Sequence, residues 1–195
     1  MKRYVLALFV LLLVLLAGGA AYVYFGVYNV AADDPHWRAN YWLLQETRNR
    51  SIAVRSADLT PPNLRDPKLI LKGAGQYAAM CVTCHLAPGQ PDTELRLGLY
   101  PQPPNLAHAH IAPNRVFWVI KHGLKMSGMP AWGKSHDDAT IWSMVAFVQE
   151  LPSLSPKQYR VMVRRAPPDE DMDMQNMNMP GAATSASQLD HGHAH

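Results

Sequence analysis

Several patterns that mark common protein classes are missing from this sequence of 195 residues. No basic run is interleaved with aromatic residues, and the formal net charge of +3 comes with scattered lysines, so nucleic-acid binding is not expected. No internal repeat is visible either. Cysteine is limited to Cys81 and Cys84, so any chemistry of thiols depends on this one pair.

Charged residues are also missing from Tyr4 to Ala32. A secretory apolar region runs for about 7 to 15 residues, whereas about 20 residues span a bilayer as a helix, so residues 1–30 are predicted to be an uncleaved membrane anchor. A signal peptide cleaved near the small residues 18–21 is the alternative. Lys2 and Arg3 precede the span and predict a cytoplasmic N-terminus. We therefore expect a single-pass protein of the inner (cytoplasmic) membrane, with its main domain in the periplasm.

The two cysteines and the histidine that follows them form the motif CVTCH, which ends at His85. A dithiol redox site would need a thioredoxin-like alternation of strands and helices, and no run of β-branched residues lies near the pair. A structural zinc site would need four ligands. Covalent haem attachment uses both thiols in thioether bonds and the adjacent histidine as an iron ligand. This third chemistry alone explains why the histidine follows immediately.

Residues 31–65 are predicted to form a connector helix and a proline-rich linker. Asp34 and Pro35 are residue types favoured at a helix start, and Trp37 and Tyr41 follow at helical spacing. We expect this helix to lean either on the membrane surface or on the next domain. The stretch ADLTPPNLRDP then breaks the helical pattern and predicts a stiff spacer.

Residues 66–155 are predicted to form a helical domain. Asp66 precedes a proline and the stretch KLILKGAGQYAAM, which indicates a helix that runs into the CVTCH motif. Asp137 can cap a second helix, DATIWSMVAFVQEL, which carries an apolar stripe. The two helices are expected to cross where Gly73 leaves room for Trp142 or Phe147. A shorter helix, RVFWVIKH, lies between them in the sequence.

Residues 66–155 resemble the class I c-type cytochromes, specifically the membrane-anchored bacterial kind with a single haem. The resemblance rests on GAGQYAAMCVTCH, PQPPNL, FWVIKHGLKMSGMPAW and DDATIWSMVAFVQELP, which occur in the order found in that family. It implies an all-α fold, the class I cytochrome c haem fold, here preceded by an N-terminal transmembrane helix. It also implies one covalent haem c with iron, attached at Cys81 and Cys84. His85 would be the proximal ligand, and it would donate a hydrogen bond near Pro104.

The sixth iron ligand decides between an electron carrier and a protein that binds a substrate at the iron. The stretch KMSGMPAWG offers Met126 and Met129 where glycine and proline prevent a continuous helix. Met129 is the predicted ligand, because Gly128 allows close approach and Pro130 fixes the turn, and because the resemblance places the ligand at the methionine of Gly-Met-Pro. The histidines His108, His110, His122 and His136 are expected to lie on the surface.

This coordination predicts a one-electron carrier rather than an enzyme. The expected redox partners are a dehydrogenase, a quinol-oxidising complex or a terminal oxidase in a respiratory chain. Scattered lysines could steer an acidic partner to the haem edge; they are Lys68, Lys72, Lys121, Lys125 and Lys134. The alternative is a haem enzyme or gas sensor with an open distal site.

Residues 156–195 are predicted to be a tail rich in methionine and histidine. Thioether and imidazole groups suit copper, which makes a copper-handling role a further alternative. The groups in question are Met172, Met174, Met177, Met179, His191, His193 and His195. A disordered polar tail is the simpler interpretation of this composition.

Overall fold

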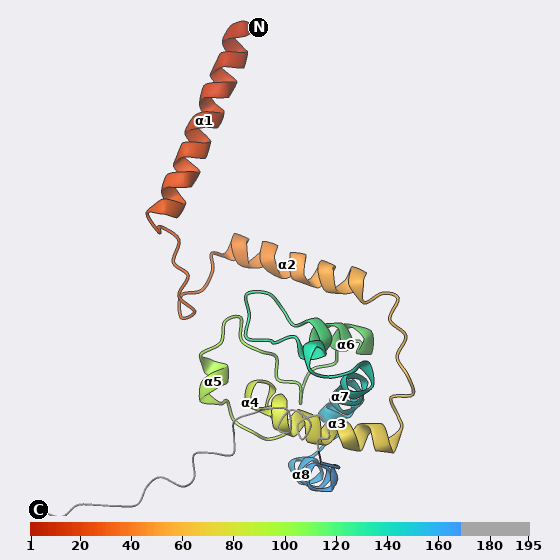
Figure 1. The fold of residues 1–195 in the computed structure, drawn as a ribbon. Helices are drawn as coiled ribbons and strands as arrows, with labels where there is room; N and C mark the ends of the chain where they lie inside the picture. The colour runs from red at the N-terminus through yellow and green to blue at the C-terminus, as the bar shows by residue number, and fades with distance from the viewer. Residues whose placement is uncertain (169–195) are drawn as a thin grey trace, which may run out of the picture. The chain divides into compact units, whose positions relative to one another are not determined.

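A computed structural model describes residues 1–168 of the chain (Figure 1). All of the regular structure in this part is helical, which confirms the predicted all-α class. The chain divides into two compact units, Met1–Tyr41 and the part that begins at Trp42.

Helix α1, Lys2–Tyr24, makes up most of the first unit. It is long and apolar enough to cross a membrane, with a mean hydropathy of 2.6 over its most apolar window and no buried residue. The predicted N-terminal transmembrane helix is therefore present in the fold. After α1 the chain folds into a tight connector, in which the Tyr28 hydroxyl lies 2.5 Å from His36 Nδ1.

Helix α2, Arg38–Arg55, begins later than its sequence suggests. Asp34 was expected at the start of this helix, but its carboxylate accepts a hydrogen bond of 2.8 Å from Asn29 Nδ2 within the connector. The carboxyl half of α2 belongs to the second unit: Ile52 is buried, and just after the helix Asn114 Nδ2 donates to Ser56 O at 2.8 Å.

Helices α3, Pro67–Met80, and α7, Asp138–Glu150, form the centre of the second unit (Figure 1). Both predicted caps are confirmed: Asp66 accepts from Lys68 N at 2.9 Å, and Asp137 accepts from Thr140 N at 2.7 Å. The two helices pack against each other, as predicted.

The crossing of α3 and α7 depends on a glycine. A Cβ added to Gly73 would lie 1.9 Å from Ser143 O and 2.9 Å from Phe147 Cβ. Phe147 is thus the bulky neighbour at the crossing, whereas Trp142 stacks on Phe117 of α6 with ring centroids 4.1 Å apart.

Shorter elements complete the domain. Helix α6, Pro113–His122, packs on α7. The side-chain amide of Asn114, its second residue, donates to Ser56 O. The remaining short elements are α4, Val82–His85, α5, Glu94–Leu97, η1, Trp132–Lys134, and η2, Leu151–Ser153.

Helix α8, Pro156–Arg165, corrects the predicted start of the tail at residue 156. Ser155 and Gln158 form a capping box, and Tyr159 is buried with its ring 6.4 Å from Tyr77 and 6.1 Å from Phe147. This ring covers a side of α3 that would otherwise face water, so the tail cannot begin before the end of α8.

The proline-rich linker is not a free spacer, in contrast to the sequence-based expectation. Leu59 and Leu64 pack against the buried core. Because these contacts attach the linker to the helical domain, its proline content does not set a distance between separate bodies.

Candidate functional site

The CVTCH motif forms one helical turn that continues directly from α3. The backbone N–H groups of Cys84 and His85 both donate to Cys81 O, at 3.1 and 2.9 Å. Residues three apart on such a turn lie on the same side, so the turn presents both thiols to one neighbour. Both thiols are free; Cys81 is buried and Cys84 is half-buried.

The surroundings favour the uncharged forms of the Cys81 thiol and the His85 imidazole. Burial raises the pKa of the Cys81 thiol to about 12, and the nearby Cys84 acts in the same direction. Burial also lowers the pKa of His85, while its hydrogen bond to a carbonyl opposes this and nearby Arg96 reinforces it. A neutral imidazole is the form that binds metal ions.

The His85 ring is oriented by backbone that follows α5. Its Nδ1–H donates to Pro104 O at 2.9 Å, and Leu106 N donates back to His85 O at 3.1 Å. This hydrogen bond fixes the tautomer, so the lone pair lies on Nε2 and is available to a metal ion.

A second set of contacts, which the sequence analysis missed, holds the acceptor segment. Arg96 Nε donates to Pro103 O at 3.2 Å, and the Arg96 guanidinium pairs with Asp92. Thr93 caps α5 by accepting from Arg96 N at 3.1 Å. The spacing of these residues in the sequence indicates the contacts: Thr93 and Asp92 precede Arg96 by three and four residues, and side chains at these spacings meet on a helical turn.

The residue after His85 has an uncommon backbone conformation. Leu86 has a φ of 64°, which is rare for residues other than glycine, and its side chain is buried. The hydroxyl of the buried Tyr77 donates to Leu86 O at 2.6 Å. Packing and this bond together hold a turn that the local chain alone disfavours.

Met129 lies in a loop between α6 and η1 that makes its own hydrogen bonds. Leu124 N donates to Met129 O at 3.1 Å, Ser127 Oγ donates to Leu124 O at 2.9 Å, and Met129 N donates to Ser127 Oγ at 3.2 Å. The Met129 side chain packs against the buried core. Met126, four residues into this loop, is 100% exposed and has a φ of 55°.

The loop that carries Met129 also approaches the segment that orients His85. A Cβ on Gly128 would lie 2.7 Å from Leu99 Cδ2, and Leu99 belongs to the stretch between α5 and Pro104. The loop that carries Met129 and the segment that holds His85 are therefore packed against each other.

Residues 68–148 match the family model described as cytochrome C oxidase, cbb3-type, subunit III. Together with the CVTCH turn, this match identifies the domain. The chain contains a c-type cytochrome domain. No curated protein and no solved structure was found to match the chain.

The donor groups of the cytochrome domain fit the covalent haem c, with its iron, that the family implies. Two thiols lie on one turn, as thioether attachment requires, and Nε2 of His85 would be available to the iron because Nδ1 is engaged. By contrast, residues 1–168 contain no group of three or more His, Cys, Asp or Glu side chains that could hold a metal ion. The structure therefore gives no support to the zinc alternative in this part of the chain.

The other histidines of the cytochrome domain differ from the expectation at one position. His108, His110 and His122 are exposed, as predicted. His136 is 8% exposed, so its prediction as a surface residue is wrong. Its ring packs edge-on against Trp132 and its Nδ1 lies 2.9 Å from Ser135 Oγ, which makes it a packing residue between η1 and α7.

The predicted copper site lies away from the CVTCH turn. The methionines and histidines of the copper prediction fall outside the described residues, and no comparison supports copper.

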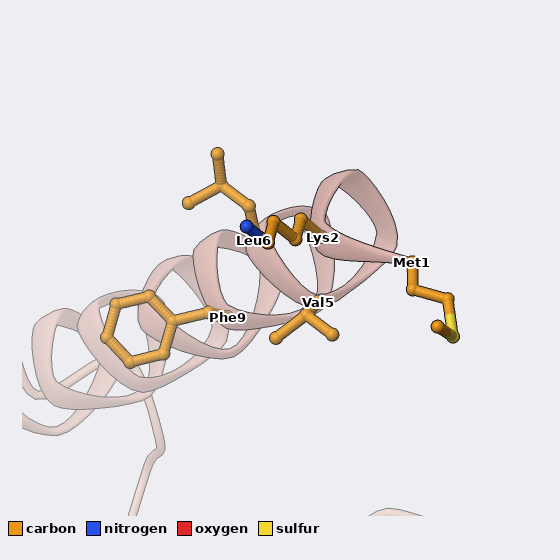
Figure 2. Close-up of a pocket in the computed structure, with 5 residues that line it drawn as sticks. All are labelled: Met1, Lys2, Val5, Leu6 and Phe9. Carbon is orange, nitrogen blue, oxygen red and sulfur yellow. The ribbon is translucent and has the colours of Figure 1, made fainter.

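Figure 2 shows a shallow hollow at the start of α1, lined by Met1, Lys2, Val5, Leu6 and Phe9. Four of these side chains are apolar, as expected for a helix surface that faces lipid.

Proposed function

We propose that this protein is a one-electron carrier with a single covalent haem c, attached at Cys81 and Cys84. His85 and Met129 are the two axial ligands in this proposal. The observation that carries it is the hydrogen bond of 2.9 Å from His85 Nδ1 to Pro104 O, because a proton on Nδ1 leaves the Nε2 lone pair available to the iron.

The assignment of Met129 is supported by its packing against the core and by the bonds of its loop. The Met129 thioether packs against the core, and both its backbone N–H and its carbonyl are engaged. The Met126 side chain has no such packing, because it is fully exposed. A ligand held in one position lowers the reorganisation that accompanies electron transfer, so Met129 is the better candidate.

When bound, a haem iron with histidine and methionine ligands gains and loses one electron at a raised potential. The chain contributes the rest. The thiols of Cys81 and Cys84 would prevent haem loss, Pro104 O would orient His85, and the Met129 side chain would keep exogenous ligands from the iron. An occupied sixth position is the reason to propose a carrier instead of an enzyme or a gas sensor.

The electron carrier would act between respiratory complexes on the periplasmic side of the inner membrane, with α1 retained as its anchor. Among the proposed partners, the description of the matched family favours a terminal oxidase. The chain should then stay with membranes after washing in high salt, because screening of charges does not release an apolar span. A mature N-terminus near Ala20, measured by mass spectrometry, would contradict this anchoring.

The test of the proposed function is a comparison of Met129→Ala with Met126→Ala in the haem-loaded protein. Met129→Ala should abolish the weak charge-transfer absorption of an oxidised haem with a methionine ligand, lower the potential and admit carbon monoxide. Met126→Ala should leave all three unchanged. In both variants the haem should stay with the polypeptide on a denaturing gel, because attachment depends on the cysteines.

The two variants also discriminate between the alternatives. If Met126→Ala causes these changes and Met129→Ala does not, Met126 is the iron ligand and the assignment as an electron carrier stands. If neither variant changes the spectrum and the unmodified protein binds carbon monoxide readily, the distal site is open and the carrier assignment is wrong.

A further inference from the structure

Helix α2 has two halves with different surroundings. Its carboxyl half is attached to the cytochrome domain through the buried Ile52 and the bond from Asn114 to Ser56 O. The segment at its amino end, residues 37–44, is apolar but exposed: Trp37 is 66% exposed, Trp42 67% and Leu43 58%. We name residues 37–44 the apolar segment.

The apolar segment is not explained by packing within the domain. Trp42, Leu43 and Leu44 are consecutive, so they point in three directions around the helix, and all three are exposed. A helix that buries one face on a protein core would leave polar residues elsewhere. Exposed apolar residues in three directions at one end, with the polar Arg38 and Asn40 among them, indicate a surrounding that offers both apolar and polar groups.

The chain path brings the apolar segment close to the end of the membrane span. Only the residues from Phe25 to Trp37 separate α1 from α2. This connector is folded on itself, because Tyr28 contacts both His36 and Trp37 and Asn29 bonds to Asp34. A folded connector is much shorter than the extended limit of about 3.3 to 3.6 Å per residue.

The residue types around this point are those of a membrane interface. Tyr22, Tyr24 and Phe25 end the span, and Trp37, Tyr41 and Trp42 follow the connector. Tryptophan and tyrosine concentrate where acyl chains meet headgroups, because the ring is apolar and its N–H or O–H is polar. Helix α2 also carries four arginines and one glutamate, a balance that favours anionic headgroups.

We propose that the apolar segment lies in the outer headgroup layer of the membrane, so that α2 is a strut with one end in lipid and the other on the cytochrome domain. The occupant of this surface is phospholipid. In that position the amino end of α2 would be held at the membrane surface by its own side chains, in addition to the covalent link to α1. This inference rests on a retained α1 but not on the nature of the haem ligands.

The test is lipid photolabelling of the full-length, haem-loaded protein in liposomes that contain no other protein. The probe is a phospholipid with a diazirine near the carbonyl end of an acyl chain, because an interfacial helix lies about 5 to 10 Å into the headgroup boundary. Trypsin cuts after Arg38, Arg48, Arg50 and Arg55, so residues 39–48 and 51–55 are released as separate peptides.

We expect adducts on peptide 39–48, which holds Trp42, Leu43 and Leu44, and none on peptide 51–55. The second peptide is a control on the same helix, since Val54 is 72% exposed and would react if lipid reached it. A Leu43→Ser/Leu44→Ser variant should lose most of the label on peptide 39–48. Its haem spectrum should be unchanged, because neither side chain is buried.

Labelling of residues 4–38 reports on the anchor within the same experiment. Adducts on residues 4–38 alone would overturn the strut while leaving the anchor intact. Equal labelling of peptides 39–48 and 51–55 would also overturn it, since the whole helix would then lie in lipid. Loss of residues 4–38 from the mature chain would remove the tether on which the inference rests and would overturn it as well. None of these outcomes changes the assignment of His85 or Met129.

Discussion

The crossing of α3 and α7 offers the most direct test of how the fold supports the haem site. Replacement of Gly73 by alanine adds one Cβ, which would lie 1.9 Å from Ser143 O and 2.6 Å from Ser143 C. Ordinary contacts of a Cβ begin near 3.4 Å. The obstacle is the backbone at Ser143, which is fully buried, so one of the two helices must move.

Two effects of opposite sign determine the size of the change. Alanine is favoured over glycine inside a helix by about 0.8 to 1.0 kcal/mol. Overpacking of a buried contact costs about 1 to 3 kcal/mol and occasionally more, and a backbone obstacle belongs at the upper end. The clash therefore outweighs the propensity, and we expect a net loss of about 2 kcal/mol. For a domain of this size, that lowers the Tm by about 8 to 16 °C.

Thermal unfolding of the haem-loaded protein, followed by helical circular dichroism, measures this change. Gly75→Ala is the matched control on the same helix: it gains the same propensity, and its added Cβ meets chiefly Ala166 Cβ, at 2.9 Å, just beyond the end of α8. We expect it to differ from the unmodified protein by less than about 1 kcal/mol. A Gly73→Ala protein as stable as the unmodified one would refute the close packing of this crossing.

Three further predictions concern single contacts. Tyr77→Phe should cost about 1 to 3 kcal/mol in denaturant unfolding, because it leaves the buried carbonyl of Leu86 without its donor. The hydrogen bond to Thr140 lowers the pKa of Asp137, so the stability that ionised Asp137 adds is present above the ordinary pKa of 3.8 and is lost as pH falls through the lower pKa of the folded state. Asp137→Asn should remove this part of the pH dependence of stability while keeping the helix cap. Identical pH profiles of stability for the two proteins would contradict this prediction. Arg96→Gln should lower the haem potential by on the order of 40 mV, since a positive charge near His85 is lost, whereas Arg96→Lys should keep most of the potential.

Local rules were sufficient to predict the helices that carry the site. Asp66 and Asp137 are cap residues whose side-chain oxygens reach backbone N–H groups only two or three residues away, so their roles depend on short spacing alone. The CVTCH turn was predicted for a similar reason, since its residue types are restricted by near neighbours that are visible in the sequence. Gly73 is different, because the atoms that require a glycine there belong to Ser143 and Phe147 on α7.

The missed features depend on partners distant in the sequence. Tyr159 is one aromatic residue in a basic stretch, and its burial requires Tyr77 and Phe147 on two other helices. His136 has a polar side chain, and only the fold reveals that Trp132 covers it. Asn114 lies just before RVFWVIKH in the sequence, but α6 already begins at Pro113, and the Asn114 amide donates to Ser56 O, 58 residues away.

The two proposed ligands stand on segments fixed to different helices, and the α3–α7 crossing links them. His85 continues from α3 through the turn at Cys81, whereas the Met129 loop ends at η1, which packs on α6 and α7. A Cβ on Gly133 of η1 would lie 2.8 Å from Lys121 O, so η1 is also closely packed on α6, although less closely than α3 is packed on α7. Movement of α3 away from α7 would therefore lengthen the distance between the proposed ligands rather than shift both together. For this reason Gly73→Ala should weaken the methionine charge-transfer absorption at temperatures below its unfolding transition, while Gly75→Ala should not.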